Sequence, residues 1–338
     1  MRFTLTTLLP NHDGEETEAS RGMNKIEPIV AERRNLLAPF AGNKPAAPQW
    51  FNDAIAHEPE RTVTDVRGAA IETLTWGERG KPGLLFLHGN GACADWWSFI
   101  APFFAETHRV AAFSMSGMGG SGWRDRYSYD IYIDEAFAVA ESTGLFDAST
   151  RPIVIGHSFG AFITSGIAGR AGSRIGGAML LDGPFLGSAA RKRQREHQGP
   201  PRPKNIYDTL AQALARFRFA PEQDCDNLYI ADWIARVSLR QFRRADDSMG
   251  WTWCFDPARF MGFLHGYPAN DLAASQCPIA VIGGSRSGFV TNKSMYELEP
   301  YVPKGTPFVV IPDSDHHIMA DQPLALVAAI RTQLANWA

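Results

Sequence analysis

Cysteine is scarce in this sequence, and its positions argue against two common kinds of site. The 338 residues contain four cysteines, Cys93, Cys225, Cys254 and Cys277, none of them in a C-x-x-C pair. This distribution is unlike a zinc site and too sparse for a disulfide framework. We therefore expect a protein of a reducing compartment, the cytoplasm.

Long apolar runs are absent as well. No stretch approaches the ~18 apolar residues of a membrane span. Residues 1–10 contain only a short apolar stretch, followed by an acidic run without a small-residue cleavage site, which is unlike a secretory signal. Residues up to about Gly22 show no pattern of a folded element, and the natural chain could begin at Met1 or at Met23. We expect no association with membranes.

Neither sign of charge dominates. There are 33 Lys and Arg residues against 36 Asp and Glu, a formal net charge of −3, so the chain offers no basic field for nucleic acid. A local basic cluster without interleaved aromatic residues is predicted to be a solvated loop: Arg191, Lys192, Arg193, Arg195, Arg202 and Lys204. The 45% hydrophobic and 20% charged fractions are typical of a globular protein with a real core.

From residue 61 onward, short β-rich runs alternate with segments of helical apolar spacing. This alternation predicts an α/β fold, a mostly parallel eight-stranded sheet flanked by helices. The expected strands are 62–66, 70–76, 83–87, 110–115, 152–155, 178–181, 279–282 and 308–311, and expected helices include 96–105, 131–143, 295–301 and 324–337. Residues 61–183 and 277–338 form the predicted core, and residues 1–60 a partly disordered N-terminal extension.

Residues 184–276 interrupt this alternation with proline-rich loop and helical pattern. No strand is expected there, and we predict an inserted helical cap that sets substrate preference. Its many aromatic side chains either form the cap's own core or roof an apolar pocket. They are Trp233, Trp251, Trp253, Phe255, Phe260, Phe263 and Tyr267, of which Trp233 and Trp251 are candidate pocket residues.

The segment G-H-S-F-G at residues 156–160 directly follows the apolar run 152–155, as in a strand that breaks sharply around a serine. Glycines two residues before and after Ser158 permit a strained turn that lifts the hydroxyl above the sheet and points the start of the next helix at it. That helix is expected at residues 159 to about 171. The pattern predicts a nucleophile, and its alternative interpretation is a glycine-rich turn without chemistry.

A serine hydroxyl is a weak nucleophile until a histidine accepts its proton. Residues 309–323 have the pattern of a strand, a loop with the adjacent histidines His316 and His317, and the start of a helix. Histidine suits this task because its ordinary pKa of about 6.5 lets it take and return a proton near neutral pH. The sequence thus offers a nucleophile and a base in one chain.

In three motifs and their order, the sequence resembles the α/β-hydrolase superfamily over residues 62–338. The motifs are the His-Gly loop after the third strand, the turn around Ser158 and the terminal histidine loop. In that family the catalytic histidine commonly stands seven residues before a proline, in a pattern like G-H-x-x-x-x-E-x-P, and His316 has this spacing to Pro323 with Asp321 in the acidic place. The resemblance implies that His316 is the base and that its rival, His317, packs the loop.

The same resemblance implies an acid that orients the histidine. The usual place is the loop after the seventh strand, here residues 283–290, which contains no carboxylate. The family also uses the end of the sixth strand, where this sequence has Asp182. Asp182 is therefore the predicted acid. Asp313 and Asp315 are weaker candidates because residues so close in sequence to the histidine rarely reach its distal ring nitrogen.

Two backbone N–H groups are implied as the oxyanion hole, those of Phe159 and Asn90. Trp96, Trp97 and His157 are further candidate pocket residues. A family motif of the form D-x-x-G-x-G-x-S appears at residues 114–121 with Ser114 in place of the aspartate. Because that aspartate supports the loop and is not part of the triad, the change leaves the expected reaction class as it is.

The resemblance implies a serine hydrolase that cleaves a small-molecule carboxylic ester or lactone through an acyl-enzyme, without cofactor or metal. A carbon–carbon bond hydrolase or a cofactor-free haloperoxidase would use the same triad, because the fold does not dictate the substrate. An epoxide hydrolase or dehalogenase is disfavoured, since those members have an aspartate where Ser158 stands. A non-catalytic binding protein on the same scaffold is the alternative of another class. Nothing in the sequence indicates an oligomeric state.

Overall fold

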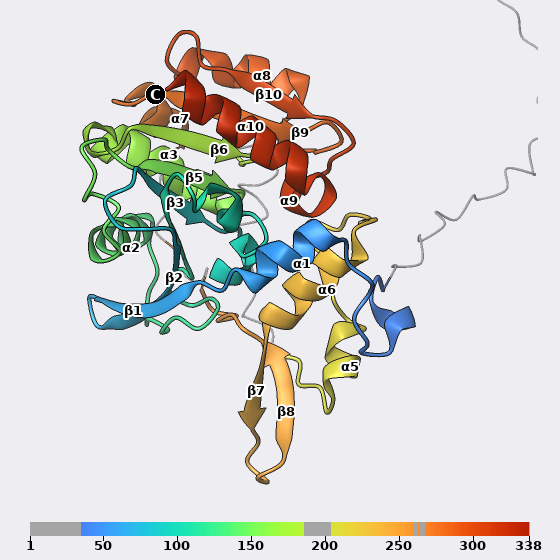
Figure 1. Cartoon of the computed structure of the whole chain (residues 1–338). Coiled ribbons are helices and arrows are strands. Elements are labelled where there is room, and N and C mark those ends of the chain that lie inside the picture. Colours follow the sequence, from blue (N-terminus) through green and yellow to red (C-terminus); the bar gives the residue numbers. More distant parts are fainter. Residues whose placement is uncertain (1–34, 186–203, 260–262, 264–267, 338) are drawn as a thin grey trace, which may run out of the picture. The chain divides into compact units, whose positions relative to one another are not determined.

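Eight strands form the central sheet, in the order β1-β2-β4-β3-β5-β6-β9-β10 (Figure 1). Strand β2 pairs antiparallel with β1 and β4, and all other neighbours are parallel. The strands are β1 (Glu60–Val66), β2 (Ala69–Trp76), β3 (Gly83–Leu87), β4 (Arg109–Phe113), β5 (Ile153–His157), β6 (Gly177–Leu181), β9 (Ile279–Gly284) and β10 (Phe308–Ile311). Each overlaps a predicted strand, so the expected α/β fold with a mostly parallel sheet is confirmed.

The computed structural model describes residues 35–185, 204–259, 263 and 268–337. The basic residues predicted at 191–202, the aromatic residues Phe260 and Tyr267, and residues 1–34 lie outside these ranges. The described helices are α1 (Gln49–Ala56), α2 (Tyr129–Ser142), α3 (Phe159–Ala171), α5 (Leu210–Leu214), α6 (Leu228–Val237), α7 (Pro268–Ala273), α8 (Asn292–Leu298), α9 (Ile318–Asp321) and α10 (Pro323–Asn336). Short 3-10 turns are η1 (Ala38–Phe40), η2 (Ala94–Trp97), η3 (Ala101–Phe104), η4 (Gly172–Arg174) and η5 (Glu299–Tyr301).

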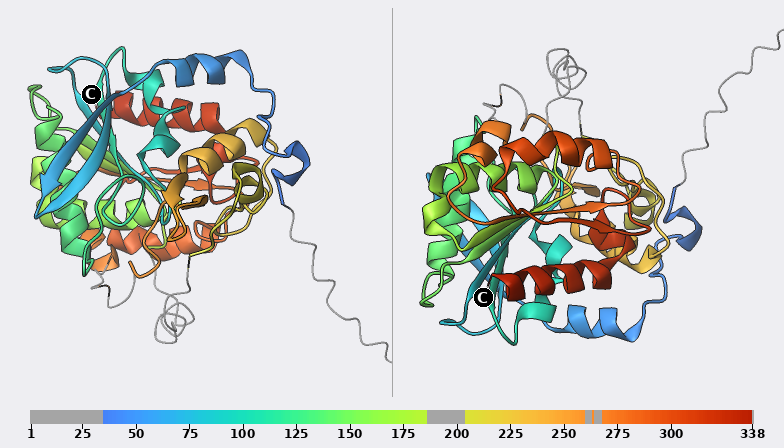
Figure 2. Two further views of the ribbon diagram at one scale, coloured as in Figure 1. Left: turned by 90° about the horizontal axis from the view of Figure 1, so that it is seen from below. Right: turned by 90° about the horizontal axis from the view of Figure 1, so that it is seen from above.

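Both faces of the sheet are covered, so its central strands are buried along their whole length. In β3, Leu84 and Phe86 pack in one cluster with Ile330 of α10, whereas Leu85 and Leu87 pack in a second cluster with α2 and α3. Figure 2 shows α1 and α10 on one side of the sheet and α8 on the other. This two-sided burial explains why the parallel strands are continuous apolar runs and not alternating ones.

Two sequence predictions need correction. Residues 96–105 are not one helix but belong to the short turns η2 and η3, because Pro102 lies at the start of η3 and has no N–H to continue a helix from the preceding turn. The second concerns residues 184–276 between β6 and β9, which we call the insertion. It was expected to contain no strand, but β7 (Leu239–Arg243) and β8 (Met249–Trp253) form an antiparallel hairpin.

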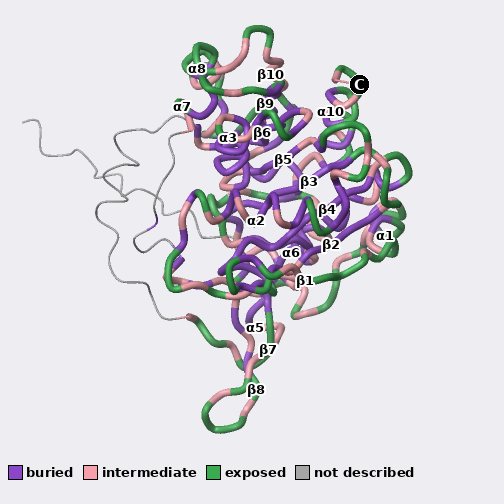
Figure 3. The backbone as a smooth tube through the Cα atoms, turned by 90° about the vertical axis from the view of Figure 1, so that its left-hand side faces the viewer, coloured by how far each residue is buried: buried purple, intermediate pink, exposed green. Residues whose placement is uncertain are grey.

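The hairpin escaped prediction because neither strand is a continuous apolar run: β7 contains Arg240, Gln241 and Arg243, and the tryptophans of β8 alternate with Gly250 and Thr252. Only Leu239 is buried in β7, and Gly250 and Thr252 are the buried positions of β8. Figure 3 shows its far end as exposed chain. Residues 35–60 of the expected extension include α1, whose Phe51 is buried against Tyr229 and Trp233 of α6. The insertion therefore packs on a helix that precedes the first strand.

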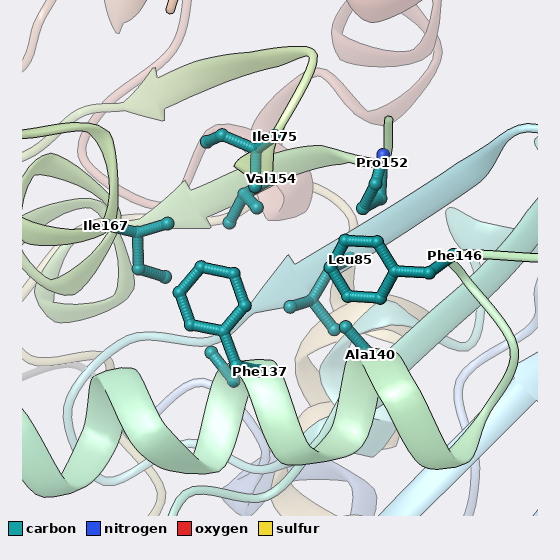
Figure 4. A pocket seen from close by; sticks show the side chains of 9 residues that line it. Leu85, Phe137, Ala140, Phe146, Pro152, Val154, Ile167 and Ile175 are labelled. Atoms are coloured by element: carbon teal, nitrogen blue, oxygen red, sulfur yellow. The ribbon is translucent and has the colours of Figure 1, made fainter. Parts of the chain in front are cut away.

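A cavity of about 10 Å³ lies between α2, α3 and the sheet (Figure 4). Its described lining is apolar, from Leu85, Phe137 and Ile167 among others. A water molecule in such a space would lack hydrogen-bond partners. The cavity is therefore a packing gap of the core.

We expect Ile167→Ala to lower the free energy of unfolding by about 2–5 kcal/mol, because it enlarges this gap in a core that relaxes only partly. Ile167 is 1% exposed, whereas Ile206, the matched control, is 48% exposed. Ile206→Ala should cost less than about 1 kcal/mol. Urea titration of both variants measures the difference, and equal midpoint shifts would contradict this account of the core.

Candidate active site

The site lies where the strand order of the sheet reverses. The chain passes from β3 to β4 on one side and then to β5 on the other side of β3. The carboxyl ends of β3 and β5 therefore diverge into loops on opposite sides, and the crevice between them is where parallel sheets bind ligands. The His88-Gly89 turn follows β3, and Ser158 follows β5.

Ser158 sits in a strained turn between β5 and α3, with φ 54° and ψ −112°. Such a conformation costs about 1–3 kcal/mol and persists only where its surroundings enforce it. A Cβ on Gly156 would lie 2.3 Å from Thr164 Oγ1, and one on Gly160 would lie 2.4 Å from the Leu87 carbonyl oxygen. Both glycines are therefore needed for close backbone approach, and α3 begins and ends at the predicted residues, 159 and 171.

The structure brings Ser158, His316 and Asp182 into one hydrogen-bonded chain. His316 Nε2 lies 2.8 Å from Ser158 Oγ, and His316 Nδ1 lies 2.5 Å from Asp182 Oδ2. Because an ionised carboxylate only accepts, Nδ1 carries the ring proton and Nε2 presents a lone pair to the serine hydroxyl. This tautomer is the one that can remove the hydroxyl proton.

Asp182 is fully buried and accepts hydrogen bonds from residues 283–290, the loop that contains no carboxylate. Ser287 donates its hydroxyl to Asp182 Oδ2 at 2.6 Å, and the Gly284 N–H approaches Oδ1 at 3.4 Å. The Phe289 ring lies 4.5 Å from that of His316. The absence of a carboxylate from residues 283–290 gave no reason to expect a role for this loop, yet the Ser287 hydroxyl fixes the acid that follows β6.

Two further buried histidines, His157 and His317, pack their rings against that of His316. His157 Nε2 lies 2.9 Å from the His316 carbonyl oxygen and so donates to it. His317 donates its backbone N–H and its Nδ1–H to Gln223 Oε1, at 2.8 and 2.7 Å. Gln223 in turn donates to Asp321. His157 and His317 therefore stabilise the loop of His316. The donors of His317 are both bound to Gln223 of the insertion.

The loop after β3 is held by His88 and by a cation of the insertion. His88 Nδ1 donates to the Gly89 carbonyl at 2.7 Å, and Nε2 accepts from the Met115 N–H at 3.0 Å. Arg259 donates from Nε and Nη2 to Asn90 Oδ1 at 2.8 and 2.7 Å. The Asn90 side chain is thus fixed from the insertion, a contact that the sequence does not reveal.

A carboxylate replaces the one that the motif at residues 114–121 lacks. Glu72 of β2 accepts from the Ser114 hydroxyl at 2.7 Å and from the Gly120 N–H at 2.9 Å. Ser114 Oγ accepts from the Ala94 N–H at 3.0 Å. Glu72 is far away in the sequence, and only the pairing of β2 with β4 brings it to this loop.

The candidate pocket tryptophans pack in different places. Trp96 donates to Ser238 Oγ at 2.9 Å and lies 5.8 Å from the His317 ring. Trp97 is fully buried against Phe86 in the core, at 4.9 Å. Trp233 donates to the Asp95 carbonyl, and Trp251 bridges to Tyr207 within the insertion. Of the four, Trp96 is thus the one whose ring contacts the histidine loop.

All four cysteines are free and buried. Within the described ranges, His, Cys, Asp and Glu do not form a group of three or more that could hold a metal ion. The described helices also include none that is long and apolar enough to cross a membrane.

Comparison with known proteins matches this chain to a family. A family model described as "Alpha/beta hydrolase family" matches residues 84–330. A curated relative, the esterase Rv0045c of Mycobacterium tuberculosis, is 27% identical over 281 residues, which cover 81% of this chain and 89% of that protein.

Solved structures show the same fold. That of the Mycobacterium tuberculosis esterase has a TM-score of 0.62 at 23% identity, covering 88% of this chain and 96% of the other. A hypothetical protein of Pseudomonas aeruginosa PAO1 has a TM-score of 0.65 at 22% identity, covering 82% and 99%.

We expect opposite effects of Ser114→Asp in two backgrounds. In the otherwise unchanged protein it places a second carboxylate beside Glu72 and should lower the free energy of unfolding by about 1–3 kcal/mol. After Glu72→Ala, which removes the acceptor for Ser114 and Gly120, the same change should recover part of the lost stability. Urea titration of the two single variants and the double variant forms the cycle. Additive effects would show that Glu72 does not substitute for the missing aspartate.

Stability should fall as the pH drops from 6.5 to 5. Burial lowers the pKa of His88 to about 4 and the pKa values of His157 and His317 well below the ordinary value. Between pH 6.5 and 5 these histidines become protonated in the unfolded chain but stay neutral in the native state, so acid favours unfolding. The carboxyls of Asp321, with a pKa raised by burial to about 6, and of Glu135 oppose part of this.

The net slope should be of the order of 2 kcal/mol per pH unit. Urea titrations at several pH values measure this slope. His317→Asn should reduce it by the contribution of one histidine, because one proton fewer is then taken up on unfolding. A free energy of unfolding that stays level over this range would contradict the burial of three neutral histidines.

Proposed function

This chain belongs to the alpha/beta hydrolase family, and we propose that it is a serine hydrolase which cleaves carboxylic esters through an acyl-enzyme on Ser158. The observation that carries this proposal is the chain of hydrogen bonds from Asp182 through His316 to Ser158 Oγ. The curated relative named an esterase supports an ester as the bond that is cleaved. A lactone, being a cyclic ester, falls within the same chemistry.

In the proposed reaction, His316 Nε2 takes the hydroxyl proton while Ser158 Oγ attacks the carbonyl carbon of the ester. The tetrahedral intermediate collapses, and the leaving alkoxide takes the proton from Nε2 and departs as the alcohol. Water then attacks the acyl-enzyme with the same proton path reversed, releasing the carboxylic acid and free Ser158. Throughout, Asp182 holds the Nδ1 proton and stabilises the imidazolium.

The oxyanion of each tetrahedral intermediate needs donors fixed in advance, worth about 3 kcal/mol each. We assign this role to the backbone N–H groups of Phe159 and Asn90. Phe159 is the first residue of α3, whose N-terminus carries partial positive charge. The hydrogen bonds from Arg259 to the Asn90 side chain stabilise the loop that would present the second donor, the Asn90 N–H.

We also assign the insertion, residues 184–276, as the cap over a core of residues 61–183 and 277–338. Two contacts support this assignment. Gln223 receives both N–H groups of His317, and the Phe219 ring lies 4.7 Å from the His317 ring. Because the insertion contacts the histidine loop itself, its side chains are placed to select among acyl or alcohol groups. The free, buried cysteines agree with a cytoplasmic location.

A fluorophosphonate probe tests the nucleophile directly, because it reacts with an activated serine. We expect labelling of the unchanged protein at Ser158, loss of labelling and of ester hydrolysis in Ser158→Ala, and an unchanged circular dichroism spectrum. Hydrolysis retained above a few per cent in that variant would refute the assignment.

The base and the acid are tested in the same assay. His316→Ala should lower kcat by several orders of magnitude, and Asp182→Asn by about 10⁴-fold, as when a triad member is removed or its tautomer is lost. His317→Ala is the matched control and should cost far less. If His317→Ala were the more damaging of the two alanine variants, the base would be His317, and a mild loss in Asp182→Asn would indicate a structural aspartate.

A further inference from the structure

A second cavity, of about 300 Å³, lies beside the hairpin of the insertion. Two cations, Lys204 and Arg259, line it together with the aromatic side chains of Trp253 and Phe255. Asn205 and Thr252 add polar groups, and none of its described lining residues is acidic. The cavity thus combines apolar walls with positive charge.

This cavity adjoins the loop of the proposed oxyanion hole. Arg259, which lines it, holds Asn90 Oδ1, and a Cβ on Gly91 would lie 3.6 Å from Arg259 Nη2 and 3.9 Å from Phe255 Cδ1. A Cβ on the preceding Gly89 would lie 3.3 Å from Ser158 Cβ. Residues 89–91 therefore lie between the nucleophile and the cationic wall, and Asn90 is hydrogen-bonded to that wall through Arg259.

Positive charge is in excess around this wall. Lys204 Nζ lies 4.2 Å from the centre of the Trp123 ring, and the Arg240 guanidinium lies 5.5 Å from the same centre. The neighbouring acid, Asp256, accepts from the Tyr127 hydroxyl at Oδ2 and from the Ala258 N–H at Oδ1, both at 2.8 Å. It supplies one negative charge against the three cations Lys204, Arg240 and Arg259. Burial, and then the charges of Arg240 and Arg259, lower the pKa of Lys204.

Cations gathered in this way repel one another, and an anion between them would relieve the repulsion. A carboxylate on a short apolar chain matches both features of the lining, since charge-assisted hydrogen bonds suit Lys and Arg, and the chain suits Trp253 and Phe255. We propose that this cavity binds a carboxylate of the substrate, so that the esters preferred by this protein are anionic. The inference rests on the proposed function of Ser158.

Paired substrates that differ only in charge test the proposal. One pair is the monophenyl ester of adipic acid and its counterpart with a terminal amide, and the other is the acetate ester of 6-hydroxyhexanoic acid and of its amide. In at least one pair, we expect the anionic member to have a kcat/KM about tenfold higher or more at low salt. The ratio should shrink as salt is raised to 0.5 M.

Lys204→Met should reduce this ratio several-fold, and Lys204→Arg should restore most of it. The control is Lys293→Met in α8, which changes the net charge equally at an exposed ion pair with Glu297. In Figures 1 and 3, α8 lies at the opposite end of the view from the hairpin. A ratio near one in both pairs, or one that Lys204→Met leaves unchanged, overturns the proposal.

Binding to Ser158→Ala, measured by calorimetry with the same four compounds, separates this inference from the proposed function. Tighter binding of the anionic member, lost in Ser158→Ala/Lys204→Met, supports the carboxylate site even if the unchanged protein cleaves none of the four esters, an outcome that counts only against the esterase function. Equal binding of both members, together with cleavage of both at equal rates, refutes the carboxylate site and leaves the esterase function in place.

Discussion

The orientation of one imidazole ring, that of His316, is the constraint on which the rest of the site depends. Its two nitrogens lie 2.5 Å from Asp182 Oδ2 and 2.8 Å from Ser158 Oγ. These partners follow β6 and β5, whereas His316 follows β10. Three segments distant in the sequence meet because parallel strands all end at the same edge of the sheet. A sheet of another topology would separate them.

Buried polar groups away from the reacting atoms keep that edge in shape. Glu72 supports the loop at residues 114–121 from β2, and Glu135 of α2 accepts from the Ser116 N–H at 2.9 Å while it pairs with Arg124. His157 donates to the His316 carbonyl. Breaking one of these contacts would leave a buried donor or acceptor unpaired, which costs about 1–3 kcal/mol. The loops are therefore fixed before any substrate arrives.

The insertion contacts the histidine loop, the loop after β3 and the glycine loop of the candidate site. Gln223 holds His317 beside the base, and Arg259 holds Asn90 beside the proposed oxyanion hole. The strand-like stretch after β8 is bound to the glycine loop through the Gly119 N–H, which donates to the Cys254 carbonyl at 2.8 Å. A rearrangement of the insertion would therefore reach both the base and the oxyanion loop, so substrate selection and catalytic geometry are physically coupled.

The sequence by itself determined the elements whose signals are local. The eight strands, the helix at residues 159–171 and the turn around Ser158 follow from apolar runs, glycine spacing and a strand-to-helix break. The spacing of His316 to Pro323 and the place of Asp182 after the sixth strand, compared with the family pattern, led to the prediction of these two residues as base and acid. Their hydrogen bonds needed the tertiary structure, because residues 134 positions apart meet only through the sheet.

Only the tertiary structure decided the rest, because the interactions join segments with no common pattern. Neither strand of the hairpin in the insertion is a continuous apolar run, and only Leu239, Gly250 and Thr252 of its strands are buried. Glu72 accepts from Ser114, which stands where the family motif has an aspartate. Ser287 donates to Asp182, which follows β6. Arg259 donates to Asn90, which lies 169 positions earlier in the sequence. In each case a charged or hydroxyl side chain finds its partner through strand order and packing, which a linear motif does not encode.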